Sequence, residues 1–96
     1  MKSSISITEF NKLQNIKNII DIRSVEKYNF NHISEAINIQ LDKLIVNPSK
    51  YLSKDTIYYI YCQKGIQSRK LCSYLRGMGY NVINIQGGYE AWILTK

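Results

Sequence analysis

The chain has few of the residues that bind metals or form disulfides, with two cysteines and one histidine among its 96 residues. A four-ligand zinc site would need carboxylates at unusual spacing, so we expect no metal and no cofactor. Cys62 and Cys72 lie ten residues apart, which is not the CxxC spacing of a dithiol redox motif. A disulfide between them is disfavoured in a reducing cytosol.

Long apolar runs are also missing. The block from Ile57 to Cys62 is among the longest, well short of the roughly 18 residues that a membrane-spanning helix needs. The N-terminal sequence MKSSISITEF lacks the continuous apolar stretch of a secretory signal. We therefore expect a cytoplasmic protein with no membrane partner.

Acidic residues are scarce, because 7 Asp and Glu face 13 Lys and Arg, and the net charge is +6. The excess is uneven along the chain. Segment 56–89 has no acidic residue and contains four cations, namely Lys64, Arg69, Lys70 and Arg76. A local positive charge of this kind indicates a small anionic ligand in that segment rather than a generally basic surface.

The length fits one domain, residues 1–96. Short β-branched or aromatic runs predict strands at residues 5–7, 18–22, 37–39, 56–61 and 81–85. Helices are expected over residues 8–13, 24–28, 41–46, 49–52, 68–78 and 89–94, with Thr8 and Ser68 as N-caps. This alternation predicts an α/β fold with a central, mainly parallel five-stranded sheet flanked by helices on both faces.

Cys62 stands where the strand at residues 56–61 ends, and five residues connect it to the helix near Ser68. In this arrangement, backbone N–H groups of the loop and of the helix N-terminus converge above the sulfur. These dipoles, together with Lys64 and Arg69, favour the thiolate over the thiol. Gly65 can adopt the positive φ that folds such a loop back on itself.

A cysteine at a strand end can also be a small buried hydrophobic residue. The short connection, the glycine and the basic surroundings favour a nucleophile at Cys62. Cys72 is different, because it lies in the middle of a predicted helix beside Leu71 and Leu75. We interpret Cys72 as a core residue.

Four blocks of sequence resemble a known family. Residues 62–68, CQKGIQS, resemble the CxxGx[R/T/S]S loop of the single-domain rhodaneses, which are sulfurtransferases. Residues 20–23, IDIR, are similar to the family's DVR strand end. Tyr28 and residues 32–39, HISEAINI, match its EY…GHIxGAxNIP segment, and residues 87–92, GGYEAW, match GGxxAW. The order and spacing of all four blocks indicate a rhodanese-like domain.

The resemblance implies a sulfurtransferase that works through a persulfide on Cys62. The sulfur donor would be thiosulfate, a persulfide, which another protein could carry, or a polysulfide, and the acceptor a thiol or cyanide. No general base is required when the thiol is already ionised. The substrate would be bound by the active-site loop and the helix start, namely Gln63, Lys64, Gly65, Ile66, Gln67, Ser68 and Arg69. Asp21 and Arg23 would form a supporting ion pair near the rim.

The loop length bears on the substrate. Within the family a six-residue loop, here residues 62–67, goes with sulfur, and a loop one residue longer goes with phosphate or arsenate. Cysteine phosphatases also need an arginine six positions after the cysteine, where this chain has Ser68. Many small rhodaneses have arginine at the position of Gln67, and this neutral residue puts efficient use of thiosulfate in doubt.

Other departures from the family pattern lie around His32. Asn31 replaces a glycine, and we expect it to keep a left-handed turn. Ser34, Glu35 and Gln40 replace Pro, Gly and Pro, which suggests local adjustment of a loop. We expect His32 itself to be a structural residue that bonds to the backbone, and Trp92 to pack in the core or at the rim.

Two alternatives remain at this point. Six of the 8 tyrosines share the basic segment, and aromatics interleaved with cations can bind single-stranded nucleic acid. This alternative is disfavoured, because three of them (Tyr58, Tyr59 and Tyr61) belong to a strand that should be largely buried. The other is a non-catalytic rhodanese-like interaction module, although such domains often lack the cysteine that this chain retains.

Overall fold

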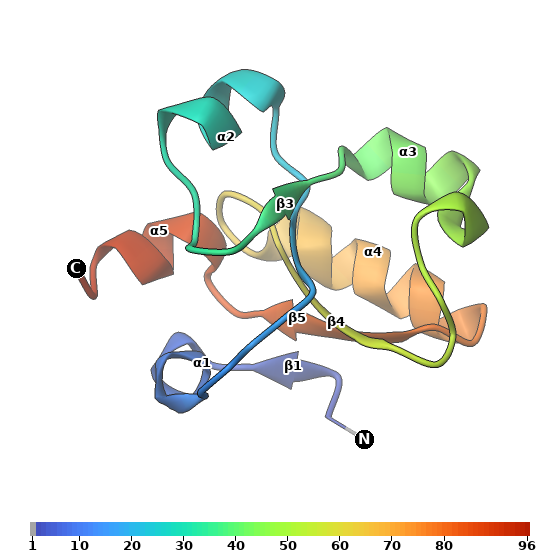
Figure 1. Cartoon of the computed structure of the whole chain (residues 1–96), viewed down its shortest axis with the longest axis horizontal. Coiled ribbons are helices and arrows are strands. Elements are labelled where there is room, and N and C mark those ends of the chain that lie inside the picture. Colours follow the sequence, from blue (N-terminus) through green and yellow to red (C-terminus); the bar gives the residue numbers. More distant parts are fainter. Residues whose placement is uncertain (1) are drawn as a thin grey trace.

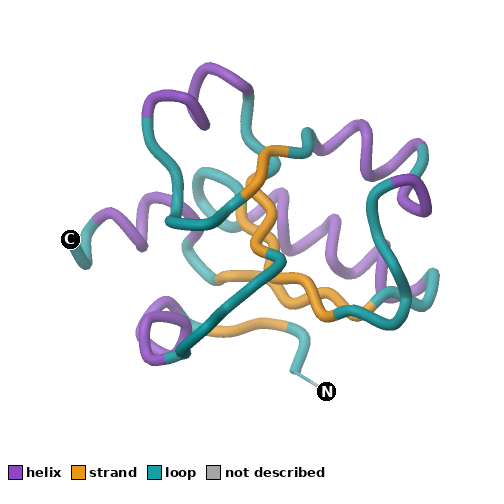
Figure 2. Tube along the Cα trace, in the orientation of Figure 1, coloured by secondary structure: helices purple, strands orange, loops and turns teal. Residues whose placement is uncertain are grey.

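The computed structural model describes residues 2–96, which contain one sheet of five parallel strands in the order β1-β5-β4-β2-β3 (Figures 1 and 2). The strands are β1 (Ser4–Ile5), β2 (Ile19–Asp21), β3 (Ile37–Asn38), β4 (Ile57–Tyr61) and β5 (Asn81–Ile85). Each of the five predicted strands has a counterpart, and most are shorter than the sequence indicated; the first lies at Ser4–Ile5 and not at 5–7, because Ile7 begins α1. The central strand β4 ends immediately before Cys62.

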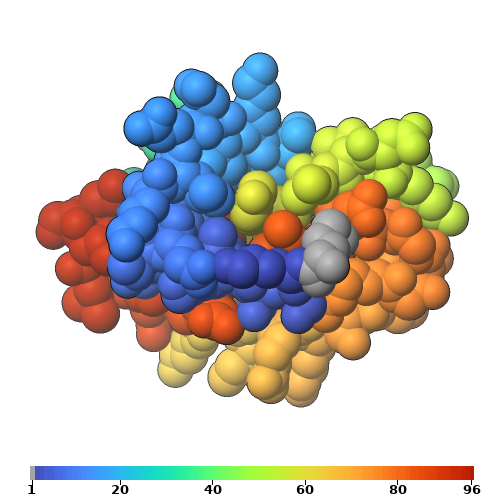
Figure 3. Space-filling model, turned by 90° about the horizontal axis from the view of Figure 1, so that it is seen from below, coloured from blue at the N-terminus to red at the C-terminus, as the bar shows by residue number. Residues whose placement is uncertain are grey.

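Helices cover both faces of the sheet, as the sequence predicted. They are α1 (Ile7–Lys12), α2 (Val25–Phe30), α3 (Leu41–Val46), the 3-10 helix η1 (Pro48–Lys50), α4 (Ile66–Gly77) and α5 (Gly88–Ile93). In Figure 1, α3 and α4 lie on one side of the sheet, and α1 and α5 lie on the other. Figure 3 shows the N-terminal segment lying across one edge of the molecule, between the C-terminal helix and α4.

The near-continuous apolar strands supply both hydrophobic cores, because successive side chains point to opposite faces. In β4, Ile60 packs under α4 with Leu71 and Leu75, whereas Tyr61 packs on the other face with Trp92. This two-sided burial is why the apolar run shows no polar alternation.

The sequence misplaced two helix caps. Helix α1 begins at Ile7 because the Ser6 hydroxyl accepts the Glu9 N–H (3.1 Å) and Glu9 reciprocates, whereas Thr8 lies inside the helix. Helix α4 begins at Ile66 after Gly65, so Ser68 is a buried first-turn residue and not the N-cap. A serine early in a helix can turn its hydroxyl inward when a buried polar partner is available there.

The left-handed residue in the loop after α2 is also different from the prediction. Asn31 has extended backbone (φ −170°, ψ 149°), so the expectation of a left-handed turn there is wrong. Its side-chain Oδ1 instead accepts a hydrogen bond from the N–H of the next residue, His32 (3.0 Å). The left-handed conformation falls on Glu35, with φ 74°, where the family pattern has glycine.

This strain generates a stability prediction. A β-carbon in the left-handed region costs roughly 1–2 kcal/mol, so Glu35→Gly should raise the free energy of unfolding by about 1 kcal/mol. Urea unfolding followed by circular dichroism measures the change. Glu26→Gly, on the exposed face of α2, should instead lower stability by about 1 kcal/mol. A Glu35→Gly variant no more stable than the parent would contradict the strain argument.

Candidate active site

Cys62 lies at the carboxyl end of the central strand, where parallel sheets place their ligand sites. Its side chain is only 3% exposed. It forms part of the wall of an open cavity of about 390 Å³, which is lined by Lys27, Cys62, Gln63, Lys64, Ile66 and Gln67. Cys62 is therefore largely removed from bulk water but borders an open cavity.

Backbone N–H groups converge on this sulfur. The Gly65 N–H donates to Cys62 Sγ over 3.1 Å, and the Ser68 N–H donates to it over 3.3 Å. Gly65 provides no side-chain cap for α4, so the sulfur accepts an N–H of the first helical turn that would otherwise lack a partner. The arrangement suits an anionic sulfur, which gains from each of these dipoles.

The loop after Cys62 folds tightly against the start of α5. Gly65 has φ 90°, as the sequence predicted for its turn, and a β-carbon on it would lie 2.7 Å from the Gly87 nitrogen. The Tyr89 N–H donates to the Cys62 carbonyl over 2.9 Å. A β-carbon on Gly88 would lie 2.2 Å from that same oxygen, so only glycine fits there.

Two cations line the Cys62 cavity. Lys64 comes from the loop, as expected. Lys27 comes from α2, and the sequence did not indicate it because it lies outside the acid-free segment. The remaining predicted cations are elsewhere. Arg69 is exposed on α4 and does not line this cavity, and Arg76 donates to carbonyls of Val82 and the N-terminal segment.

The predicted ion pair between Asp21 and Arg23 is present and buried, with Nη2 and Oδ2 2.8 Å apart. Asp21 also accepts the Tyr61 hydroxyl over 2.6 Å, and burial together with this contact raises the pKa of Tyr61 well above its ordinary value. Arg23 reaches the loop by donating from Nη1 to Gln63 Oε1 over 3.2 Å, and its guanidinium stacks over the Tyr89 ring. The pair thus connects β2 to the residue after Cys62.

Cys72, His32 and Trp92 have packing and hydrogen-bonding contacts that indicate a structural role. Cys72 is fully buried, and burial raises the pKa of its thiol to about 12. His32 Nδ1 donates to the Tyr28 carbonyl over 2.8 Å, and its ring stacks on the Tyr28 ring. Trp92 belongs to α5, and its side chain is buried in the core. Each of these three residues is placed as its sequence context predicted.

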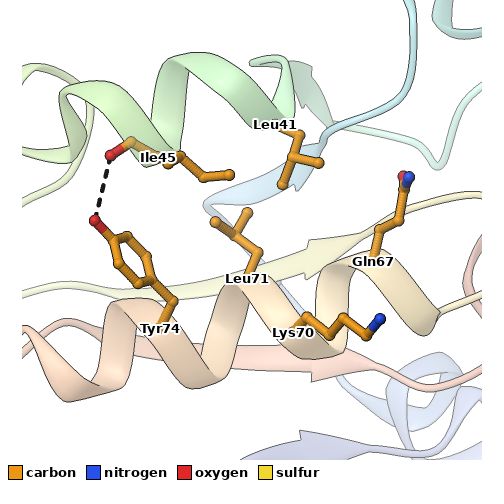
Figure 4. Close-up of a pocket in the computed structure, with 6 residues that line it drawn as sticks. All are labelled: Leu41, Ile45, Gln67, Lys70, Leu71 and Tyr74. Atoms are coloured by element: carbon orange, nitrogen blue, oxygen red, sulfur yellow. Dashed lines mark hydrogen bonds between the residues drawn. The ribbon is translucent and has the colours of Figure 1, made fainter.

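A second depression of about 330 Å³ lies between α3 and α4 (Figure 4). It is lined by Leu41, Ile45, Gln67, Lys70, Leu71 and Tyr74. Gln67 lines both this groove and the Cys62 cavity, so the two adjoin at the start of α4. Gln67 is exposed and leaves the shared wall uncharged.

Within residues 2–96, no group of three or more His, Cys, Asp and Glu side chains is placed to hold a metal ion. No helix of the same range combines the length and the apolar character needed to cross a bilayer.

Comparisons with known proteins agree with this geometry. A family model described as the rhodanese-like domain matches residues 6–95. The thiosulfate sulfurtransferase GlpE of Coxiella burnetii is 31% identical over 75 residues, covering 77% of this chain and 69% of that protein. The adenylyltransferase and sulfurtransferase uba4 of Ogataea parapolymorpha is 31% identical, but the match covers 77% of this chain and only 19% of that protein.

Solved structures show the same likeness. The crystal structure of a rhodanese-like domain protein from Staphylococcus aureus has a TM-score of 0.82 and 33% identity to this chain. The match covers 96% of this chain and 91% of that one.

The contact at Gly88 generates a prediction. Gly88→Ala should push the Cys62 carbonyl away and lower the free energy of unfolding by about 1–3 kcal/mol, the usual range for overpacking. It should also slow the alkylation of Cys62 by iodoacetamide, because the loop that orders the N–H donors shifts. Gly77→Ala is the control, since outside its chain neighbours and the backbone of its own helix no atom lies within 4 Å of a β-carbon there. Equal stability of the two variants would refute the proposed steric role.

Proposed function

The chain belongs to the rhodanese-like domain family, and we propose that it is a sulfurtransferase that carries sulfane sulfur as a persulfide on Cys62. The observation that carries the proposal is the pair of backbone N–H donors from Gly65 and Ser68 on Cys62 Sγ, beside an open cavity. Relatives named as sulfurtransferases support the reaction class.

The reaction proceeds in two displacements. The Cys62 thiolate attacks the sulfane sulfur of the donor, a new S–S bond forms, and the donor's own bond to that sulfur breaks. With thiosulfate the leaving group is sulfite, which takes the bonding electron pair. An acceptor thiolate or cyanide then attacks the outer sulfur, and the Cys62 thiolate leaves. No oxidant takes part, because the donor supplies sulfur at the required oxidation level.

The cavity suits an anionic donor. Lys27 and Lys64 line it with Cys62, and the neutral Gln67 stands where many small rhodaneses have arginine. A lysine ammonium attracts an anion as a point charge, whereas an arginine fork fixes the orientation of an oxyanion. We infer that the donor is attracted by charge and can be a small anion such as thiosulfate or a persulfide.

The alternative functions have less support in the structure. A phosphatase would need a cation at position 68, but Ser68 is a buried neutral residue there and Arg69 is exposed. A stacking surface for nucleic acid would need several exposed tyrosines, but of the six in the basic segment only Tyr74 is exposed, and Tyr61 is fully buried. A purely structural module would not require N–H donors aimed at a cysteine sulfur.

Intact-mass spectrometry tests the proposed chemistry. Incubation with thiosulfate or a low-molecular-weight thiol persulfide, followed by removal of the donor, should add the mass of one sulfur atom to the protein. A thiol acceptor should then remove that mass. Cys62→Ser should prevent the addition, and Cys72→Ser should leave it unchanged because that thiol is buried and protonated. Absence of the adduct with both donors would refute the sulfurtransferase function.

The roles of the two lysines have a separate test. Lys27→Ala and Lys64→Ala should each raise KM for thiosulfate roughly fivefold at low salt, the effect of about 1 kcal/mol of charge attraction in water. The effect should shrink at high salt because ions screen it. Arg69→Ala is the matched control, since Arg69 lies outside the cavity. A larger effect from Arg69→Ala than from Lys27→Ala would contradict the assignment.

A further inference from the structure

Asn84 is a buried polar residue in an otherwise apolar stretch of β5. It is 3% exposed, and its neighbours Val82, Ile83 and Ile85 are all buried hydrophobic residues. Burying an amide costs stability unless hydrogen bonds compensate it. A well-packed apolar side chain at this position would avoid that cost. Packing alone therefore does not explain the amide.

The reason is its contact with the sulfur site. The Ser68 hydroxyl donates to Asn84 Oδ1 over 2.5 Å, and the Cys62 thiol donates to Ser68 Oγ over 3.3 Å. All three residues are buried. They form a short hydrogen-bonded chain from β5 to the nucleophile, separate from the backbone donors already described.

The direction of this chain depends on Asn84. A serine hydroxyl has one proton, and here that proton points at Asn84 Oδ1, so Oγ accepts a hydrogen bond from the sulfur. This direction suits a protonated thiol. A thiolate or a persulfide has no proton on its sulfur and would face the lone pairs of Oγ instead.

An amide can reverse the chain. If the Asn84 carboxamide turns by half a revolution, its Nδ2–H donates to Ser68 Oγ, and the hydroxyl proton then points at the sulfur. Asparagine carries both a donor and an acceptor on one planar group. Aspartate when ionised can only accept, and leucine can do neither.

We propose that Asn84 is a positioning residue that orients the Ser68 hydroxyl, and so allows the site to hold Cys62 either as a thiol or as its anion. The inference rests on the proposed function only in that Cys62 reacts as an anion. Its test therefore uses iodoacetamide, which alkylates Cys62 without a sulfur donor. The role of Asn84 can then be judged even if the protein does not transfer sulfur.

The experiment is a double-mutant cycle on the full chain, with the rate of Cys62 alkylation at pH 8 as readout. Asn84→Asp should slow alkylation about tenfold or more, because the carboxylate holds the serine proton away from the sulfur. In a Ser68→Ala background the same change should slow alkylation by a factor at least about threefold smaller, because the connection through the hydroxyl is gone and only the through-space repulsion of the carboxylate remains. Asn81→Asp, at the other end of β5, is the matched control and should leave the rate within about twofold.

Equal slowing by Asn84→Asp in both backgrounds, or no slowing at all, would overturn the proposal. If Asn84→Asp does not fold by circular dichroism, Asn84→Leu takes its place in the same cycle. The ratio of its rate to that of its parent should then differ by about threefold or more between the two backgrounds. Equal ratios would show that Asn84 only packs, and would overturn the proposal as well.

Discussion

The hydrogen bonds from backbone N–H groups to the Cys62 sulfur join the fold to its chemistry. They connect the end of the central strand to the first turn of α4, where Gly65 and Ser68 would otherwise lack an acceptor. The sulfur thus serves as the acceptor that a capping side chain provides in other helices. Because the same dipoles favour negative charge, the contact that begins the helix also favours a nucleophilic sulfur.

Two further contacts fix the loop around that sulfur. The start of α5 holds the strand end through the Tyr89 N–H and the Cys62 carbonyl, at a distance that only Gly88 permits. The buried pair of Asp21 and Arg23 reaches Gln63 from β2. The loop is therefore held by two elements that are distant in sequence, β2 and α5, as well as by the helix α4 that follows it.

The strands and the faces of the sheet followed from the sequence because the short, nearly continuous apolar runs at 18–22 and 56–61 leave few alternatives. The helix caps did not, because the hydroxyl of Ser68 finds a better partner inside the protein than at the helix end. Lys27 was missed because only tertiary structure brings α2 to the Cys62 cavity. Asn84 was missed because a single amide within a strand does not reveal what it faces.

The distribution of charge sharpens the view of the proposed substrate. Four cations lie close together in sequence, yet of these only Lys64 lines the cavity, and Lys27 joins it from another element. Both ammonium groups end flexible side chains, so they concentrate anions at the opening without imposing one geometry. The fixed donors are the backbone N–H groups, and these act on the sulfur itself. A site of this kind selects its donor by negative charge and transferable sulfur more than by the shape of an oxyanion. Such selection does not require an arginine at position 67, where this chain has the neutral Gln67.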